Sequence, residues 1–334
     1  MSGPARAGAL LVLLALVLAS PLRADDDPGV QGQVEAYLSL TKHDEARIRA
    51  KAIEMLGGLG RDAAAALPRA LELLRADPEA AVRAAAARAA VRLTEPKEVV
   101  PPLTAALGDA QTEVRVAAAQ VLADCGATAA PAVPTLRELV TATATPAPLQ
   151  LASCRALAAI GKAALPAVPD LLKVLRDPKR ARLIREAAAT ALGALGAASP
   201  ESLGALGDGL RDESSGLREA CARALGALGP AAAPAAKALG AALSHTDAIT
   251  RWQAALALAA IGPGARAARP QLEAALQDAG RDIRAAAAEA LGKLGDPAAL
   301  PALRAHLALP SEHHTVQLAV EQAIAALDPP RPRR

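Results

Sequence analysis

An apolar residue followed by a polar one returns along this chain at a nearly fixed interval. The clearest copies are Ile48-Arg49, Val82-Arg83, Val114-Arg115, Ile184-Arg185, Leu217-Arg218 and Ile283-Arg284, and weaker copies are Leu149-Gln150, Thr250-Arg251 and Val316-Gln317. If the second residue of each pair is taken as a marker, successive markers stand 32 to 35 residues apart. An interval of this length predicts a stack of about nine copies of one supersecondary unit.

Each marker begins an amphipathic run. Positions −1, +3, +7 and +10, counted from the marker, are small or apolar throughout, which is the buried stripe of a helix. A glycine stands eleven residues past the marker in seven copies: Gly60, Gly126, Gly161, Gly196, Gly229, Gly262 and Gly295. A glycine just beyond an apolar run is the usual left-handed end of a helix. The pattern therefore predicts a helix of about thirteen residues from each marker, the second helix of its repeat.

A proline begins the first helix of most repeats. These prolines are Pro68, Pro101, Pro134, Pro169, Pro234, Pro270 and Pro301. Proline is favoured in the first turn because the N–H that it lacks would have no partner there. The first repeat has an atypical first helix, expected from Val34 to Leu40, and the ninth has Asp328 in place of the final glycine. Such departures at both ends are typical of capping repeats.

An aspartate separates the two predicted helices in five repeats. They are Asp77, Asp109, Asp177, Asp212 and Asp278, and in four of them the marker arginine follows six residues later. Aspartate can cap the second helix, and it can also pair with an arginine of an adjacent repeat. Such pairs predict a structural ladder that fixes the pitch of the stack, formed by Asp77, Arg83, Asp109, Arg115, Asp212, Arg218, Asp278 and Arg284. We favour this role over ligand binding because charges this regular usually serve a fold.

The proline-led helix, the interhelical aspartate, the Val-Arg pair and the Ala-Ala-x-Ala-Leu-Gly-x-Leu-Gly ending resemble HEAT repeats, most closely the short subtype named after phycobilisome (PBS) lyases. The resemblance covers residues 34–328. It implies an all-α fold, a right-handed α-α superhelix (HEAT/armadillo-like solenoid) of about nine two-helix repeats of ~33 residues. Because the repeat is a scaffold with many uses, the resemblance is specific for fold and not for function.

The composition agrees with a helical fold, since 52% of the residues are hydrophobic, only 1% are aromatic and Phe is absent. Ala and Leu must fill the core, and both are strong helix formers. Cys125, Cys154 and Cys221 fall in small or apolar columns, so we interpret them as buried free thiols. The formal net charge of +3 becomes about +1 without Arg6 and Arg23, which lie in the segment described next. With no basic field and few aromatic rings, we expect no nucleic-acid partner.

Residues 1–24 have the pattern of a signal peptide. Arg6 supplies the positive start, Ala9–Ala19 is an unbroken apolar stretch, and Pro21 precedes the small residue Ala24. An apolar stretch this short does not make a permanent membrane anchor. We therefore expect cleavage after Ala24, a secreted or periplasmic protein and no membrane insertion afterwards; an uncleaved anchor would keep the same compartment. Residues 25–33 form an acidic and polar linker, and residues 329–334 a basic Pro/Arg tail.

The +1 and +5 columns of the second helices vary, and because they are four residues apart they share one face. In HEAT families the second helices line the concave side, so the resemblance makes this face the floor of a groove. Trp252 and Leu256 form the only large apolar pair in these columns. We predict a partner-binding surface made of Trp252, Leu256, Arg223, Glu219, Arg155, Leu151 and Glu186. The alternative is that Trp252 packs against a neighbouring second helix and only fills space.

Candidate chemistry is sparse. Glu312, His313 and His314, with His306 nearby, could hold a divalent ion, but a polar loop in a terminal repeat is the simpler interpretation. Deoxyhypusine hydroxylase and the bilin lyases have similar repeats, but the His-Glu dipeptides of the former are missing from this sequence. We therefore predict a monomeric, non-catalytic scaffold or adaptor for a protein partner, without a cofactor. The alternative is a metal- or tetrapyrrole-linked enzyme or a lyase-like accessory protein.

Overall fold

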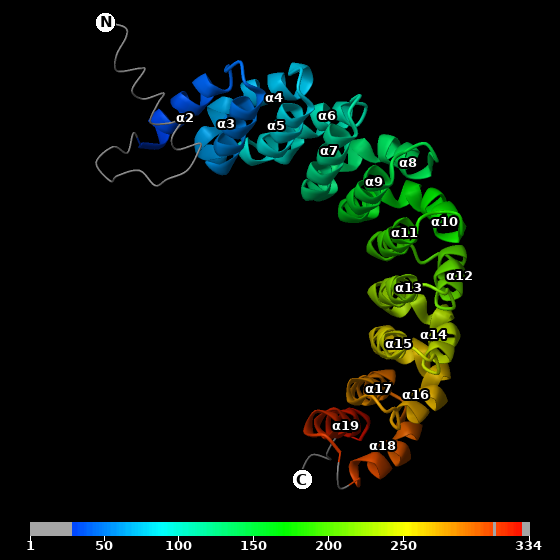
Figure 1. The fold of residues 1–334 in the computed structure, drawn as a ribbon. Coiled ribbons are helices and arrows are strands. Elements are labelled where there is room, and N and C mark those ends of the chain that lie inside the picture. Colours follow the sequence, from blue (N-terminus) through cyan, green and yellow to red (C-terminus); the bar gives the residue numbers. More distant parts are fainter. Residues whose placement is uncertain (1–28, 310–311, 329–334) are drawn as a thin grey trace, which may run out of the picture. The chain divides into compact units, whose positions relative to one another are not determined.

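All regular elements of the described chain are helices (Figure 1), in a computed structural model that describes residues 29–309 and 312–328. The chain divides into two compact units, unit 1 from Met1 to Ile160 and unit 2 from Gly161 to Arg334, and each is described by itself. The predicted signal peptide, residues 25–28 of the predicted linker and the basic tail lie outside the described residues, and residues 29–33 of that linker are helical.

Unit 1 contains the first four repeats. Its first helices are α2 (Gly29–Leu40), α4 (Leu67–Ala76), α6 (Pro96–Ala106) and α8 (Val133–Thr141); its second helices are α3 (Ala46–Gly58), α5 (Ala80–Leu93), α7 (Thr112–Asp124) and α9 (Ala147–Ile160); and two 3₁₀ segments are η2 (Gly60–Ala66) and η3 (Gly126–Ala132). Each second helix packs on the next, so that α3, α5, α7 and α9 form one layer and the first helices form the other (Figure 1).

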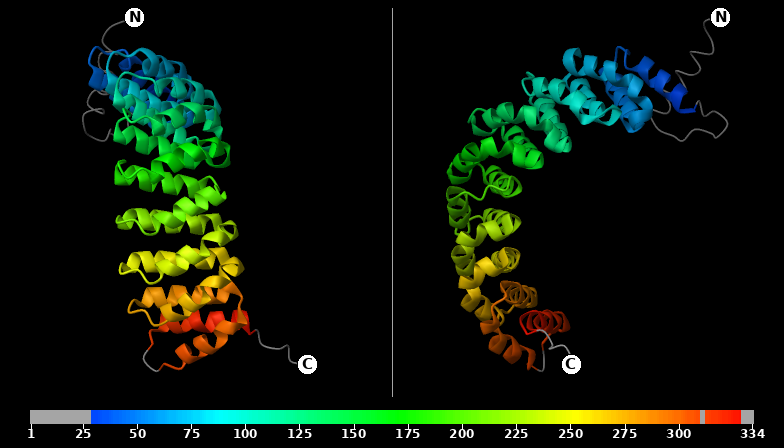
Figure 2. Two further views of the ribbon diagram at one scale, coloured as in Figure 1. Left: turned by 90° about the vertical axis from the view of Figure 1, so that its right-hand side faces the viewer. Right: turned by 180° about the vertical axis from the view of Figure 1, so that it is seen from behind.

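Unit 2 contains the last five repeats in the same two layers (Figure 2). Its first helices are α10 (Val168–Arg176), α12 (Pro200–Gly209), α14 (Ala236–Ala242), α16 (Arg269–Ala275) and α18 (Leu300–Leu307); its second helices are α11 (Arg182–Ala194), α13 (Ser215–Leu228), α15 (Ala248–Ile261), α17 (Arg281–Leu294) and α19 (His314–Leu327); and its 3₁₀ segments are η4 (Gly161–Ala167), η5 (Gly229–Ala235), η6 (Gly262–Ala268) and η7 (Pro297–Ala299). The all-α solenoid expected from the sequence is confirmed.

The core is made of leucine and alanine from the predicted stripe. The leucines seven residues past the marker are fully buried: Leu56, Leu122, Leu157, Leu192, Leu225, Leu258 and Leu291. Full burial of a leucine side chain contributes about 1.5–3 kcal/mol. Because one such leucine recurs in almost every repeat, the apolar layer continues through each unit with Tyr37 of α2 as the one buried aromatic side chain among the described residues.

Glycines let the second helices approach closely. The pairs that face each other are Gly57 with Ala89, Gly193 with Ala224, and Gly292 with Ala323. A Cβ atom placed on Gly193 would lie 2.7 Å from the Cα of Ala224, closer than real Cβ atoms come to a neighbouring backbone. The glycine eight residues past the marker is therefore required by the spacing of the helices rather than by their dihedral angles.

The predicted helix ends are confirmed, since all seven glycines have a positive φ. They are of two kinds. Gly295 has the left-handed conformation, with φ 63° and ψ 30°. Gly229 has φ 56° and ψ −136°, a region open almost only to glycine, and this turns the chain directly into η5. The glycine thus ends the second helix and also begins the connection to the next repeat.

Three expectations about the first helices are wrong. Pro101 lies inside α6, which begins at Pro96, and Pro234 lies inside η5, before α14 begins at Ala236. The first helix of the chain begins at Gly29 rather than Val34, because Gly32 does not interrupt it. Proline fits the first turn of a 3₁₀ or an α segment equally well, and sequences such as Gly-Pro-Ala-Ala-Ala-Pro-Ala do not show where one becomes the other.

One apolar stretch, Ala147–Arg176, is long and apolar enough by length and composition to cross a membrane. It comprises α9, η4 and α10. Leu149 and Leu157 of α9 are fully buried in unit 1, and Leu171 of α10 is fully buried in unit 2. Core packing of two ordinary repeats explains this apolar stretch.

Candidate functional site

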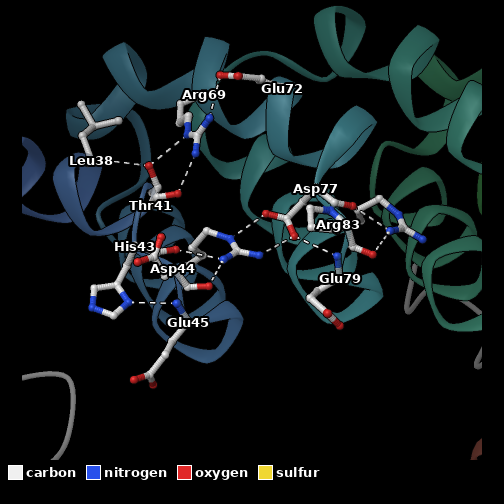
Figure 3. A network of polar contacts seen from close by, with 12 residues as sticks. Leu38, Thr41, His43, Asp44, Glu45, Arg69, Glu72, Asp77, Glu79 and Arg83 are labelled. Atoms are coloured by element: carbon white, nitrogen blue, oxygen red, sulfur yellow. Dashed lines mark hydrogen bonds and ion pairs between the residues drawn. The ribbon is translucent and has the colours of Figure 1, made fainter.

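Arg49 and Asp77 join the first two repeats. Nε and Nη2 of Arg49 donate to the two carboxylate oxygens of Asp77 at 2.8 and 2.9 Å, and its Nη1 donates to the carbonyls of His43 and Asp44 (Figure 3). Asp77 also accepts the backbone N–H of Glu79 at 3.0 Å. One guanidinium therefore holds both its own interhelical turn and the turn of the next repeat.

The same arrangement recurs within each unit. The further pairs are Arg83 with Asp109 in unit 1, and Arg185 with Asp212, Arg218 with Asp247, Arg251 with Asp278, and Arg284 with Glu312 in unit 2. The hydrogen bond from Arg83 holds the pKa of Asp109 below its ordinary value, and Arg251 does the same for Asp278. The carboxylates are therefore charged and bound at neutral pH, which makes them structural groups.

The aspartates do not, as a rule, cap the second helices. Asp77 stands two residues before the N-cap residue Glu79 and accepts its N–H, whereas Asp247 is itself an N-cap and accepts the N–H of Ile249. In each of the six pairs, the arginine binds the carboxylate of the following repeat. With its own repeat it contacts backbone carbonyls, as when Nη1 of Arg83 donates to the carbonyl of Asp77 at 2.8 Å.

Arg115 departs from the predicted ladder. Its Nη2 donates to the hydroxyl of Thr112 at 2.8 Å, and its buried Nε has no hydrogen-bond partner among the described residues. In the next repeat, Ala144 stands where four other repeats have aspartate, two residues before the position that precedes the second helix. The ladder therefore has an arginine at this position, Arg115, but no carboxylate to pair with it.

The possible metal ligands named from the sequence lie at or beside the last arginine–carboxylate pair of the ladder, Arg284 with Glu312. Both carboxylate oxygens of Glu312 accept from Arg284, at 2.8 and 2.7 Å, and Nε2 of the buried His306 lies 2.9 Å from Oε2. Hydrogen bonding by Arg284, first among the causes, lowers the pKa of Glu312 to about 2. His313 caps α19, its Nδ1 accepting the N–H of Thr315, and His314 is exposed. Across the described residues, no three His, Cys, Asp or Glu side chains are placed to hold a metal ion.

The three cysteines are buried and form no disulfide. Burial raises the pKa of the Cys221 thiol to about 12, and burial also raises that of Cys125. A thiol in this state is neither a good nucleophile nor a good metal ligand at neutral pH. These side chains act as small core residues.

An apolar stripe is exposed on α15. Ile249 and Trp252 keep 52% and 38% of their surface, Leu256 is half-buried and Ala260 is exposed. Their spacing of three or four residues puts them on one face of the helix. Trp252 is partly buried. It is therefore intermediate between the exposed partner-binding residue and the packed space-filling residue that the sequence left open.

Ion pairs border the stripe on both neighbouring helices. On α13, Glu219 lies 3.4 Å from Arg223, and on α17 Glu289 lies 2.5 Å from Lys293. Four of the predicted residues, Glu219, Arg223, Trp252 and Leu256, thus come together on two adjacent helices of unit 2.

A fifth predicted residue, Glu186, is on α11, which packs on α13, and its carboxylate accepts from the hydroxyl of Ser214, the N-cap residue of α13, at 3.2 Å. Leu151 and Arg155 are on α9, in unit 1. Five of the seven predicted residues therefore lie on three consecutive helices of unit 2, and the other two lie in unit 1.

Sequence reasoning missed the column two residues before the marker. Ile249 and Leu183 occupy it and expose 52% and 59% of their surface, and Leu318 in the +1 column exposes 45%. The −2 position lies three residues before +1 and so shares the same face. Reading that column together with +1 would have found the full apolar stripe.

Comparison with known proteins agrees with the repeat pattern. The family model described as HEAT repeats matches six overlapping windows, residues 34–111, 67–158, 100–193, 141–226, 168–259 and 236–325. Among the curated proteins, no sequence matches significantly.

Several solved structures are similar to this chain. The Escherichia coli protein YibA is 18% identical with a TM-score of 0.53, covering 93% of this chain and all of its own. A chain of the CpcE–CpcF complex of phycocyanin lyase from Nostoc sp. PCC7120 is 24% identical with a TM-score of 0.44, covering 77% of this chain and 98% of its own. Kap121p is 12% identical with a TM-score of 0.46, and this chain spans only 44% of its length. At these identities the likeness extends to the fold alone.

Proposed function

This chain belongs to the HEAT-repeat family, and on that premise we propose that it is an exported, non-catalytic scaffold that binds a protein partner on the face of its second helices. The observation that carries the proposal is the exposed stripe of Ile249, Trp252 and Leu256 on α15, bordered by ion pairs on α13 and α17. An apolar centre with a polar rim is the usual anatomy of a protein interface.

The partial burial of Trp252 favours a role as an anchor. About six-tenths of its surface is already covered, so the ring is held in place before a partner arrives. Binding then costs less side-chain entropy than it would for a free side chain. Tryptophan is also among the residues that most often dominate binding energy at interfaces.

The placement of the reactive side chains supports a non-catalytic role. Cys221 is buried with a raised pKa, and Glu312 is held by Arg284. His43 and His245 each use Nδ1 to accept the backbone N–H two residues further on, at 3.0 Å. These groups serve the interhelical turns and the core rather than a common reaction centre.

Export follows from the sequence pattern of residues 1–24, which lie outside the described residues. The three cysteines, which form no disulfide, are compatible with an oxidising compartment because all are buried. N-terminal sequencing of the protein recovered from the periplasm or medium would test this, with Asp25 expected as the first residue. Recovery of the full-length chain from the cytoplasm would contradict it.

The binding proposal is tested by capture from an envelope extract. The parent and a Trp252→Ala/Leu256→Ala variant are compared, with Leu165→Ala as the control because Leu165 is 43% exposed and belongs to η4 rather than to a second helix. We expect the parent and the control to retain a partner that the double variant loses, with all three giving the same circular dichroism. Equal capture by the three folded proteins would contradict the proposal.

A further inference from the structure

Arg115 is the one ladder arginine of unit 1 that has no carboxylate partner among the described residues. In the two preceding pairs of the ladder, Nε and Nη2 of the arginine bind both oxygens of one carboxylate. The Nε of Arg115 is buried without a hydrogen-bond partner, and its Nη2 donates instead to the hydroxyl of Thr112 at 2.8 Å. The donors that bind a carboxylate elsewhere in unit 1 are therefore present at Arg115 but bind none.

The acidic residues that stand nearest to Arg115 in the sequence do not neutralise it. Asp109 is held by Arg83 through both of its oxygens, and it also accepts the backbone N–H of Gln111. Glu113 is exposed and stands two residues before Arg115, so the two side chains lie on different faces of α7. Within the ladder of unit 1, the guanidinium of Arg115 is thus a positive charge without a counter-charge.

The turn of the fourth repeat leaves the place of the carboxylate open. Ala144 stands where the two preceding repeats have Asp77 and Asp109. Its side chain is a methyl group, and it is exposed together with Ala142 and Thr143. A carboxylate that approaches from solvent therefore meets only small side chains at this position.

The same turn does not need a carboxylate for its own backbone. In the preceding repeats the ladder aspartate also accepts the backbone N–H two residues further on, which for Asp109 is that of Gln111 at 2.8 Å. The corresponding residue of the fourth repeat is Pro146, which has no N–H. The unused donors therefore belong to Arg115, and the turn keeps its conformation whether or not a ligand is bound.

From these features we propose that Arg115 binds a carboxylate group of another molecule, which takes the place that an aspartate has in the preceding repeats. The carboxylate lies side-on to Nε and Nη2, in the bidentate arrangement of Arg83 with Asp109. To form it, Nη2 exchanges its bond to the neutral hydroxyl of Thr112 for a charge-assisted bond, which is about twice as strong.

This site is distinct from the exposed stripe of α15. Arg115 belongs to α7 in unit 1 and faces an interhelical turn, whereas the stripe lies on a second helix of unit 2. The inference therefore goes beyond the proposed function and does not depend on it. Since Asp109 and Glu312 both complete pairs of the ladder, either an acidic side chain of a protein or a small free acid can carry the carboxylate.

NMR of the arginine side chains tests the inference, with acetate as the probe. The Nε–H resonances of the full chain, labelled with ¹⁵N-arginine, are followed during titration with sodium acetate and, at equal ionic strength, with sodium chloride. An Arg115→Lys variant assigns the resonance of Arg115. Arg83, whose donors are occupied by Asp109, is the internal control in the same spectra.

We expect acetate, but not chloride, to shift the Arg115 resonance along a saturating curve and to leave that of Arg83 in place. In Ala144→Asp the acetate-induced shift should be at least about tenfold smaller, because an attached carboxylate has a high effective concentration at the site. In Asp109→Ala, which frees the donors of Arg83, the Arg83 resonance should respond to acetate as well. An Arg115 resonance that moves equally in acetate and chloride, or no further than that of Arg83, would overturn the inference.

A second titration distinguishes the two sources of the carboxylate. The probe is the blocked peptide acetyl-Gly-Asp-Gly-amide, which presents the same group on a protein backbone. Tighter binding of the peptide than of acetate supports an acidic side chain of a protein as the ligand, and equal or weaker binding supports a small free acid. A peptide and an acetate ion that both leave the Arg115 resonance unchanged would exclude the site.

Discussion

The carboxylate oxygen Oδ2 of Asp77 lies 2.8 Å from Nε of Arg49, although the two residues belong to different repeats and are 28 positions apart. Both side chains are largely buried, and both guanidinium contacts are charge-assisted. The pair links two neighbouring interhelical turns at their edges, while leucine and alanine hold the layers together. In most repeats of both units, an arginine–carboxylate pair likewise links neighbouring turns while apolar side chains hold the helix layers together.

Removal of the Arg83–Asp109 pair should lower the stability of unit 1. In Asp109→Ala, the guanidinium of Arg83 loses two hydrogen bonds and stays partly buried. We expect a loss of about 1.5–3 kcal/mol in the free energy of unfolding, measured by urea denaturation. If the Arg83→Ala/Asp109→Ala double variant loses as much as both single variants together, the two residues do not interact in solution.

The carboxylate that Arg115 lacks can be supplied by a substitution. Ala144→Asp places a carboxylate where the buried Nε of Arg115 has no partner among the described residues. We expect a gain of about 0.5–1.5 kcal/mol, visible as a higher melting temperature. Thr143→Asp, which adds the same charge one residue earlier, is the control and should give no such gain.

Two glycine substitutions should have opposite effects. Gly193→Ala places a Cβ 2.7 Å from the backbone of Ala224, so we expect a loss of about 1–3 kcal/mol. At Gly204, inside α12, a Cβ would meet nothing within 4 Å, and alanine should gain about 0.5–1 kcal/mol from helix propensity. A stabilising Gly193→Ala, in the same denaturation assay, would show that the second helices are further apart than described.

The last rung should make stability depend on pH. The pKa of Glu312 is lowered in the folded state to about 2, from an ordinary value of 4.5. A depressed carboxyl pKa stabilises the fold above the unfolded-state pKa, and this stabilisation is lost as the pH falls through the folded-state pKa. The difference in melting temperature between the parent and Glu312→Gln should therefore be full at pH 6 and vanish toward pH 2. A difference that stays constant over this range would contradict the assignment.

The sequence predicts the repeats because their determinants are local. Three local features recur in or beside each second helix. The marker arginine holds the turn, the leucine of the +7 column fills the core, and the glycine ends the helix. Asp247 and Glu312 were harder to assign because they stand four and five residues before their markers rather than six, so spacing alone did not identify them as ladder residues. Whether Trp252 is exposed depends on the neighbouring helices, which no local pattern describes.

The candidate surface could be predicted only in part, because the exposure of a side chain depends on the neighbouring helices. Trp252 and Leu256 were visible as large apolar residues in a variable column. Ile249 lies in a column that also carries Gly216 and Asp282, so its exposure follows only from the packing of α15 against α13 and α17.

The central claim is that a partner contacts the face of the second helices at Trp252. Since Trp252 is the only tryptophan in the chain, 5-fluorotryptophan gives a single ¹⁹F resonance that reports on this position alone. On addition of the partner captured by the parent protein, we predict that this resonance shifts and that its solvent isotope shift decreases as water is excluded. An unchanged resonance, with binding confirmed on the same sample, would place the partner on another surface and contradict the account.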